Sequence, residues 1–145
     1  FTGLEASGKL RLLDAGQSLD LELHGDWVRA VNTTTGEWLP RIAPMRLGAS
    51  LVWAQGPWSA RLDARHNAAQ TNGPSNQLAT QAYNLVNAAL SYRQQMGSTT
   101  ALWFARLDNA GDVLAYSATS ILTQSAPGKA PLPGRSLKLG VQMAF

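Results

Sequence analysis

The 145-residue chain is long enough for one domain, and its 45% hydrophobic content is ordinary for a globular protein, which excludes disordered and collagen-like classes. Only 14% of the residues are charged, against roughly 25% in a typical soluble domain, so little is available to coat a water-facing surface. The net charge of +3 comes from basic residues that are scattered along the chain, and no nucleic-acid partner is expected.

Three further classes of feature are absent from the sequence. It has no cysteine, which excludes disulfide frameworks and cysteine-based metal sites. No run of eighteen or more apolar residues occurs, which excludes a membrane-spanning helix. The N-terminal stretch FTGLEASGKLRLLD lacks the three regions of a signal peptide, so the chain is expected to be either a mature protein or a piece of a longer one.

The first two predicted strands cover residues 3–12 and 19–27, where apolar and polar side chains alternate with a period of two. In the first run the apolar set is Leu4, Ala6, Gly8, Leu10 and Leu12. The second run places Leu19, Leu21, Leu23, Gly25 and Trp27 on one face and Asp20, Glu22, His24 and Asp26 on the other. A buried helix would not separate leucines from carboxylates in this way, so both runs predict strands with one apolar and one polar face.

Five more runs with the same alternation follow along the chain. Their apolar sets, taken at every second position, are Met45 to Trp53, Trp58 to Ala64, Val86 to Tyr92, Trp103 to Leu107 and Leu137 to Phe145. The sequence therefore predicts an all-β fold of about seven strands.

The connections between the predicted strands alternate in length. Short ones fall at residues 14–17, 55–57 and 96–98, and long ones at 32–44, 70–81 and 121–135. An antiparallel up-and-down meander puts all short links at one end, an asymmetry typical of bacterial outer-membrane barrels. About ten residues at ~3.3 Å each, tilted by about 45°, also rise roughly 23 Å, close to the ~25 Å apolar band of such barrels.

Three aromatic residues, Trp53, Trp58 and Tyr92, lie near the short links. Indole and phenol rings prefer the level of lipid head groups, so these residues are expected in an aromatic belt. The alternative is that they fill the core of a soluble sandwich.

Four segments carry motifs in a characteristic order: LPRIAPMRLGASL (39–51), QAYNLVNAALSYR (81–93), ARLDNAGDVLAYSATS (105–120) and APLPGRSLKLGVQMAF (130–145). Together they resemble the C-terminal third of the barrel of TonB-dependent outer-membrane receptors. The motif residues are Asn109, Asp112, Tyr116, Pro133, Gly134 and Arg135. One departure is Ala110, followed by Gly111, where the family usually has Leu; Asn109 and Asp112 stay in place.

The resemblance implies the C-terminal part of a 22-stranded transmembrane barrel, in which residues 1–145 form one segment without the N-terminal plug. It implies uptake of metal complexes such as siderophore-iron, haem or zinc, with energy relayed by the TonB complex through the missing plug. It also implies outer-membrane lipid as surroundings, and neither enzymatic activity nor a cofactor. Segments 81–93 and 130–145 resemble zinc-uptake receptors in particular. Seven strands are an odd number, which favours a fragment because single-chain bacterial barrels have even counts.

The chain ends on an alternating strand whose apolar residues are Leu139, Val141, Met143 and Phe145. Its apolar face is expected to meet lipid, while its free edge would pair with the first strand of the complete barrel. By the family resemblance, these four residues also form the signal read by the outer-membrane assembly machinery.

His24 and His66 are the only histidines and therefore the only candidates for a histidine-based metal site. The competing interpretation is that each is simply solvated or faces the barrel lumen. The acids Asp20, Glu22 and Asp26 near His24 could attract a cation, or could pair with Arg46, Arg61 and Arg65 of neighbouring strands.

Other functions remain open at this point. Pro133, Gly134 and Arg135 could suggest a phosphate site, but a loop-to-strand turn is the simpler interpretation because no helix follows. A small outer-membrane hydrolase would have to use His66 and Ser75, which no nucleophile motif surrounds. A soluble lipocalin-like carrier would place the apolar residues inside a closed barrel.

Overall fold

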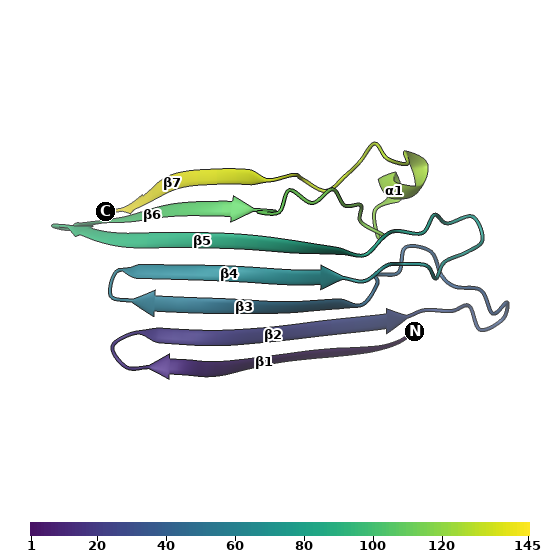
Figure 1. Cartoon of the computed structure of the whole chain (residues 1–145), viewed down its shortest axis with the longest axis horizontal. Coiled ribbons are helices and arrows are strands. Elements are labelled where there is room, and N and C mark those ends of the chain that lie inside the picture. The colour runs from purple at the N-terminus through teal and green to yellow at the C-terminus, as the bar shows by residue number, and fades with distance from the viewer.

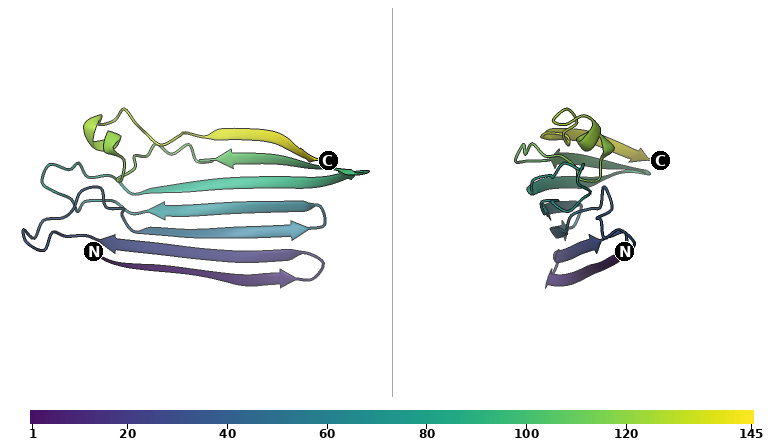
Figure 2. Two further views of the ribbon diagram at one scale, coloured as in Figure 1. Left: turned by 180° about the vertical axis from the view of Figure 1, so that it is seen from behind. Right: turned by 90° about the vertical axis from the view of Figure 1, so that its right-hand side faces the viewer.

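The computed structural model describes residues 1–145 as one antiparallel sheet in which each strand pairs with the next along the chain (Figure 1). The strands are β1 (Thr2–Asp14), β2 (Ser18–Arg29), β3 (Arg46–Gln55), β4 (Trp58–Asn67), β5 (Tyr83–Met96), β6 (Thr99–Asp108) and β7 (Ser136–Ala144). The one helix, α1 (Ile121–Ser125), lies in the connection between β6 and β7. Figure 2 shows the strands in a single layer, with no second sheet against either face. The predicted all-β meander of seven strands is therefore confirmed.

The strand register keeps most apolar and most polar residues on separate faces of the sheet, here called the apolar face and the polar face. One row of paired residues crosses all seven strands on the apolar face: Leu10, Leu21, Leu51, Leu62, Ala88, Leu107 and Leu137. A row beside it on the polar face contains Arg11, Asp20, Val52, Arg61, Ala89, Arg106 and Lys138. Because the side-chain period of a strand is two, a slip of one residue would exchange these faces.

Burial in this chain is the reverse of that in a soluble domain. Only 11 of the 145 residues are buried, and the apolar ones among them are four alanines. Leu139 is 73% exposed, whereas Asp20 on the polar face is only 5% exposed. The accessible surface of 9687 Å² exceeds the roughly 7,200 Å² expected for a compact monomer of 15.5 kDa. The large apolar side chains form no sealed core in this chain, which does not fit a soluble sandwich.

The connections have the predicted alternation of lengths. Tight turns join β1 to β2, β3 to β4 and β5 to β6 at one end of the sheet, and the long connections lie together at the other end (Figure 1). Gly56 and Gly97 adopt positive φ angles of 52° and 61° in two of the tight turns, a conformation that glycine reaches without steric cost. The two ends of the sheet therefore differ, as they do in outer-membrane barrels.

Aromatic residues form a band on the apolar face at the short-turn end. Trp58 pairs with Tyr92, which in turn pairs with Trp103, and the first two rings lie 4.6 Å apart. Trp53 belongs to the same end, where its indole Nε1 donates to Gln17 at 2.9 Å. The predicted residues Trp53, Trp58 and Tyr92 thus lie on one face, together with Trp103.

The structure corrects the first predicted strand in one detail. The pairing of β1 with β2 shifts between Arg11 and Leu13, so that Leu13 rather than Leu12 pairs with Leu19. This bulge lets one extra residue fit into β1 and moves Leu12 out of the apolar register.

The outer strands β1 and β7 do not pair with each other, so the sheet has two open edges. β7 ends at Ala144, and Phe145 beyond it is 97% exposed. No helix of the chain is both long and apolar enough to cross a membrane.

Candidate functional site

Ion pairs cover the part of the polar face formed by β1 to β4, and one of them, between Arg61 of β4 and Glu22 of β2, spans β3. Glu22 forms an ion pair with Arg61 at 2.8 Å, and Asp26 forms one with Arg46 at 2.9 Å. Both arginines are among those expected from the sequence to pair with these acids. Asp20 instead pairs with Arg11 and with Lys9, whose Nζ lies 2.9 Å from Asp20 Oδ2. Opposite charges directly across two strands stabilise a sheet modestly.

Arg61 connects this part of the face to a second acid. Its Nε donates to Asp63 at 2.8 Å and its Nη2 donates to Ser50 at 2.8 Å, while the Ser50 hydroxyl donates to Asp63 at 2.6 Å. Ser50 is 2% exposed, so its hydroxyl is satisfied entirely within this network. Positive and negative charges are thereby matched along the middle of the polar face, which suits a wall in contact with water.

Asn109, which follows β6, is the centre of a clasp that joins both ends of the last long connection. Its side chain Oδ1 accepts from Val113 N at 2.9 Å, and its Nδ2 donates to Val113 O at 3.0 Å and to Pro133 O at 3.1 Å. Its backbone N–H donates to Asn87 of β5 at 2.8 Å. Asn109 has a φ of 48° and is 4% exposed, and asparagine is one of the few residues that adopt this conformation readily.

The remaining motif residues complete this clasp. Asp112 Oδ1 accepts from the backbone N–H of Arg135 at 2.9 Å, and a Cβ on Gly134 would lie 3.1 Å from the same oxygen. Tyr116 donates to Gly128 O at 3.1 Å within the connection. The backbone N–H of Arg135 is therefore occupied by a carboxylate of the chain itself, which agrees with the turn interpretation of the Pro-Gly-Arg segment.

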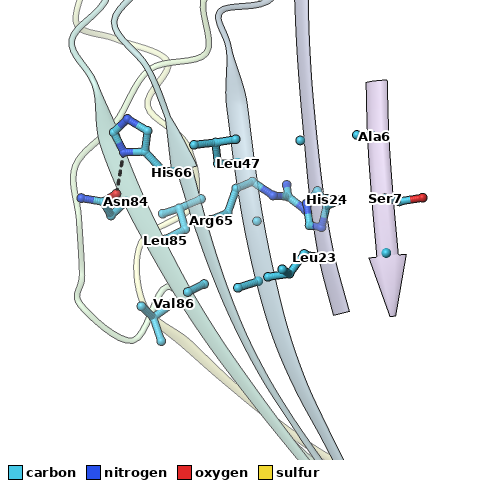
Figure 3. A pocket seen from close by; sticks show the side chains of 15 residues that line it. Ala6, Ser7, Leu23, His24, Leu47, Arg65, His66, Asn84, Leu85 and Val86 are labelled. Atoms are coloured by element: carbon cyan, nitrogen blue, oxygen red, sulfur yellow. Dashed lines mark hydrogen bonds between the residues drawn. The ribbon is translucent and has the colours of Figure 1, made fainter. Parts of the chain in front are cut away.

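The structure does not bring the two histidines together. His24 lies on the polar face, where its ring covers Gly48 so closely that a Cβ there would be 2.0 Å from His24 Cε1. His66 lies on the apolar face of β4, and its Nδ1 is hydrogen-bonded to Asn84 at 2.8 Å (Figure 3). No group of three or more His, Cys, Asp or Glu side chains is placed to hold a metal ion. Ser75 lies in the connection between β4 and β5.

A shallow hollow of about 770 Å³ lies mainly over the apolar face of β1 to β5, and Figure 3 draws the side chains that line it. Ten of its fifteen lining residues belong to the apolar face, and small residues such as Gly25, Ala49 and Ala64 create the space. Leu23, Leu47 and Val86 are among the larger residues that line it. Small side chains between large ones leave room for flexible apolar groups.

A different hollow, of about 410 Å³, lies on the polar face at the long-connection end. It is lined by residues at that end of β3 to β7 and by parts of the connection after β6, including Ser117, Thr119 and Pro133. Arg65, Asn67 and Tyr83 come into this wall from β4 and β5. The connection thus covers part of the polar face, and a polar cavity remains beneath it. The motif residues Asn109 and Pro133 also line it, but the other lining residues come from five strands and from the connections, so no single local motif marks the whole site.

Glutamine side chains tie the three long connections to one another. Gln70 donates to Ile42 O at 2.7 Å, and Gln77 accepts from Arg41 N at 2.9 Å, which joins the first two connections. Gln124 of α1 both donates to Leu78 O at 3.1 Å and accepts from Leu78 N at 2.7 Å. The connections that form one end of the molecule are therefore a linked set.

Comparisons with known proteins agree with this architecture. The family model described as TonB dependent receptor-like, beta-barrel matches residues 1–110. No curated protein matches the chain. Among solved structures, the copper transporter OprC is similar with a TM-score of 0.76 and 21% sequence identity, over 99% of this chain. The chain spans 23% of OprC, and at this identity the likeness shows the fold alone.

The match over residues 1–110 covers most of the sequence, and the open meander with exposed apolar face has the architecture of a barrel wall. The soluble-carrier and hydrolase alternatives are set aside by that match. The chain belongs to the TonB dependent receptor-like β-barrel family, whose members are transporters of the bacterial outer membrane rather than enzymes.

Proposed function

We propose that residues 1–145 are the C-terminal part of the 22-stranded barrel of an active outer-membrane transporter that takes up metal complexes. The two open edges of the sheet support this, because hydrocarbon does not tolerate unpaired backbone groups. β1 would pair with a preceding strand of the same protein, and β7 would close the barrel against its first strand.

The observation that carries the proposal is the sidedness of the sheet. A row of leucines crosses the middle of the apolar face, while paired acids and arginines cross the polar face. In a barrel wall the first face contacts acyl chains and the second lines a hydrated lumen. The band around Trp58, Tyr92 and Trp103 would then lie at the periplasmic head-group level.

The long connections would form part of the extracellular mouth through which cargo enters. We infer that a plug domain outside this chain fills the lumen and receives energy from the TonB complex. Siderophore-iron, haem and zinc are the candidate cargoes. Zinc is included because segments 81–93 and 130–145 resemble those of zinc-uptake receptors. Copper joins them because OprC, which shares the fold, is named a copper transporter.

The test of this function is uptake in the native bacterium. The gene that encodes this chain is deleted and restored on a plasmid, and uptake of radiolabelled iron chelates, haem, zinc and copper is measured at limiting concentrations. We expect one of these cargoes to enter only when both the restored gene and TonB are present. Uptake that persists without TonB, or that is lost for none of the cargoes on deletion, would contradict the proposal.

Four apolar residues at alternate positions of the C-terminal stretch, Leu139, Val141, Met143 and Phe145, are proposed to act as the assembly signal. In support, the first three lie on the apolar face of β7, and Phe145 extends beyond it without a packing partner of its own. Phe145 is therefore accessible to another protein.

A further inference from the structure

A polar pair interrupts the apolar face of the sheet. His66 of β4 pairs directly with Asn84 of β5, and His66 Nδ1 lies 2.8 Å from Asn84 Oδ1 (Figure 3). Their neighbours on the same face include Leu47, which pairs with His66 from β3, and Val86, two residues after Asn84. Polar groups on a face that contacts lipid are costly unless each finds a hydrogen-bond partner, so this pair requires an explanation.

The pair has one free acceptor and one free donor. The Asn84 oxygen can only accept, so His66 Nδ1 carries the hydrogen of their bond, and Nε2 of the neutral ring is then an acceptor. Neither His66 Nε2 nor the Asn84 Nδ2 group makes a hydrogen bond within the chain. An acceptor and a donor on adjacent side chains complement an amide group, which presents one N–H and one C=O.

The space beside this pair can hold a hydrocarbon chain. Ala64 lies two residues before His66 on the same face, and it pairs directly with Ala49 of β3. Both alanines line the hollow of about 770 Å³, between the larger side chains of Leu47 and Val86. A flexible acyl chain can enter this recess and gain dispersion contacts with its lining, which a surface that only bridged the gap would forfeit.

The pair lies near one boundary of the proposed membrane layer. His66 comes four residues after Leu62, which belongs to the row of leucines across the middle of the apolar face. Four residues of a strand tilted by about 45° rise roughly 9 Å, and the ~25 Å apolar band extends about 12 Å from its middle. His66 and Asn84 therefore lie just inside the boundary toward the long connections, where acyl chains join their head groups.

We propose that this hollow binds an amide-linked acyl chain of a glycolipid in the outer leaflet. The hydrocarbon lies over Ala49 and Ala64, the amide N–H donates to His66 Nε2, and the amide C=O accepts from Asn84 Nδ2. Glycolipids built on amino sugars carry such amides, whereas glycerophospholipids hold their chains through esters, which have no donor. The inference rests on the proposed barrel wall and its orientation, and it does not depend on the cargo.

The test compares two synthetic acylated monosaccharides that differ in a single linkage, an amide in the first and an ester in the second. Their binding to the purified full-length receptor in detergent is measured by native mass spectrometry. We expect the amide form to bind about tenfold more tightly, because only the amide offers a donor to His66 Nε2. His66→Phe should abolish this preference by weakening the amide form selectively, since phenylalanine keeps a ring but has no acceptor.

A second pair of variants tests the recess. Ala64→Phe fills the space over the two alanines and should weaken binding of both forms about tenfold. Ala60→Phe is the matched control, because Ala60 lies on the same face of β4, four residues nearer the short-turn end, and does not line the hollow. That variant should bind both forms as the parent does. Heat-modifiable mobility in gels verifies that each variant is folded.

The outcomes separate this inference from the transport function. Equal binding of the two forms to the folded parent, binding of neither, or a preference for the amide that survives in His66→Phe overturns the site. So does an equal effect of Ala64→Phe and Ala60→Phe. A receptor that purifies as a dimer and becomes a monomer in Ala64→Phe would also overturn it, and would assign the hollow to a second copy of the chain.

TonB-dependent uptake of a metal complex would leave the transport function standing after any of these failures. Lipid binding that depends on the amide and on His66, without TonB-dependent uptake of any complex, supports the lipid site and refutes the transport function.

Discussion

Two adjacent residues of β3 offer a direct test of which face of the sheet contacts lipid. Leu51 points to the apolar face, between Leu21 and Leu62 on the neighbouring strands. Val52 points to the polar face, between Asp20 and Arg61. Replacing each by arginine changes the same strand at the same height, so the two variants differ only in the face that receives the charge.

The expected cost follows from the depth of the position. Leu51 is the sixth of the 10 residues of β3, which places it about 12 Å along a strand that rises roughly 23 Å, near the middle of the ~25 Å apolar band. Arginine on the lipid face at that depth costs about 2–4 kcal/mol, equivalent to a ~30- to ~900-fold change in the unfolding equilibrium. Val52→Arg should stay within about 0.5 kcal/mol, as a substitution at a hydrated surface does.

The assay is denaturant unfolding of the full-length receptor refolded into lipid vesicles, followed by tryptophan fluorescence. Leu51→Arg is expected to shift the midpoint strongly and Val52→Arg hardly at all. Equal shifts, or a larger shift for Val52→Arg, would show that the apolar face does not contact acyl chains, and the assignment of this sheet as a barrel wall would fail.

Three further predictions concern the clasp, a packed glycine and the C-terminus. Asn109→Ala removes three side-chain hydrogen bonds from a buried residue with positive φ, so we expect the free energy of unfolding to fall by about 2–4 kcal/mol. The connection after β6 should also be cleaved faster by protease added to intact cells. Unchanged protease resistance would contradict the clasp. Gly140→Ala places a Cβ 2.4 Å from the Phe104 ring and should lower the free energy of unfolding, measured by denaturant titration, by roughly 1–3 kcal/mol. The control is Gly8→Ala, whose Cβ meets nothing within 4 Å and which should be neutral or slightly stabilising. Deletion of Phe145, which is 97% exposed, should reduce the amount of receptor in outer membranes without lowering its refolding yield in detergent; an equal loss in both measurements would indicate a structural role.

The fold was largely predictable because the two faces of each strand lie in different environments, so apolar and polar side chains alternate along the sequence. Leu19, Leu21 and Leu23 could be assigned to one face by period alone, and the register then followed from matching apolar sets. The bulge at Leu12 was not predictable, since both Leu12 and Leu13 are apolar and only the pairing with β2 shows which one shifts.

The candidate site was less predictable because it depends on which strands become neighbours. Acids were expected to pair with Arg46, Arg61 and Arg65, but only the register shows that Gly48 faces Arg65 and leaves it without a partner. The motif residue Asn109 was found from the family resemblance. Its hydrogen-bond partner Pro133 lies 24 residues away and could be identified only in the folded chain.

The glutamine bridges among the long connections have a consequence for how this end of the molecule, the proposed mouth, would respond to its surroundings. Amide groups carry no charge and do not titrate, so the bonds that Gln70, Gln77 and Gln124 make are indifferent to acidity and only weakly sensitive to ionic strength. A bacterium that moves between dilute and saline water, or between neutral and acidic niches, would keep this rim assembled. Displacement of one segment by arriving cargo would instead pull on its neighbours, so that the rim would rearrange as a unit.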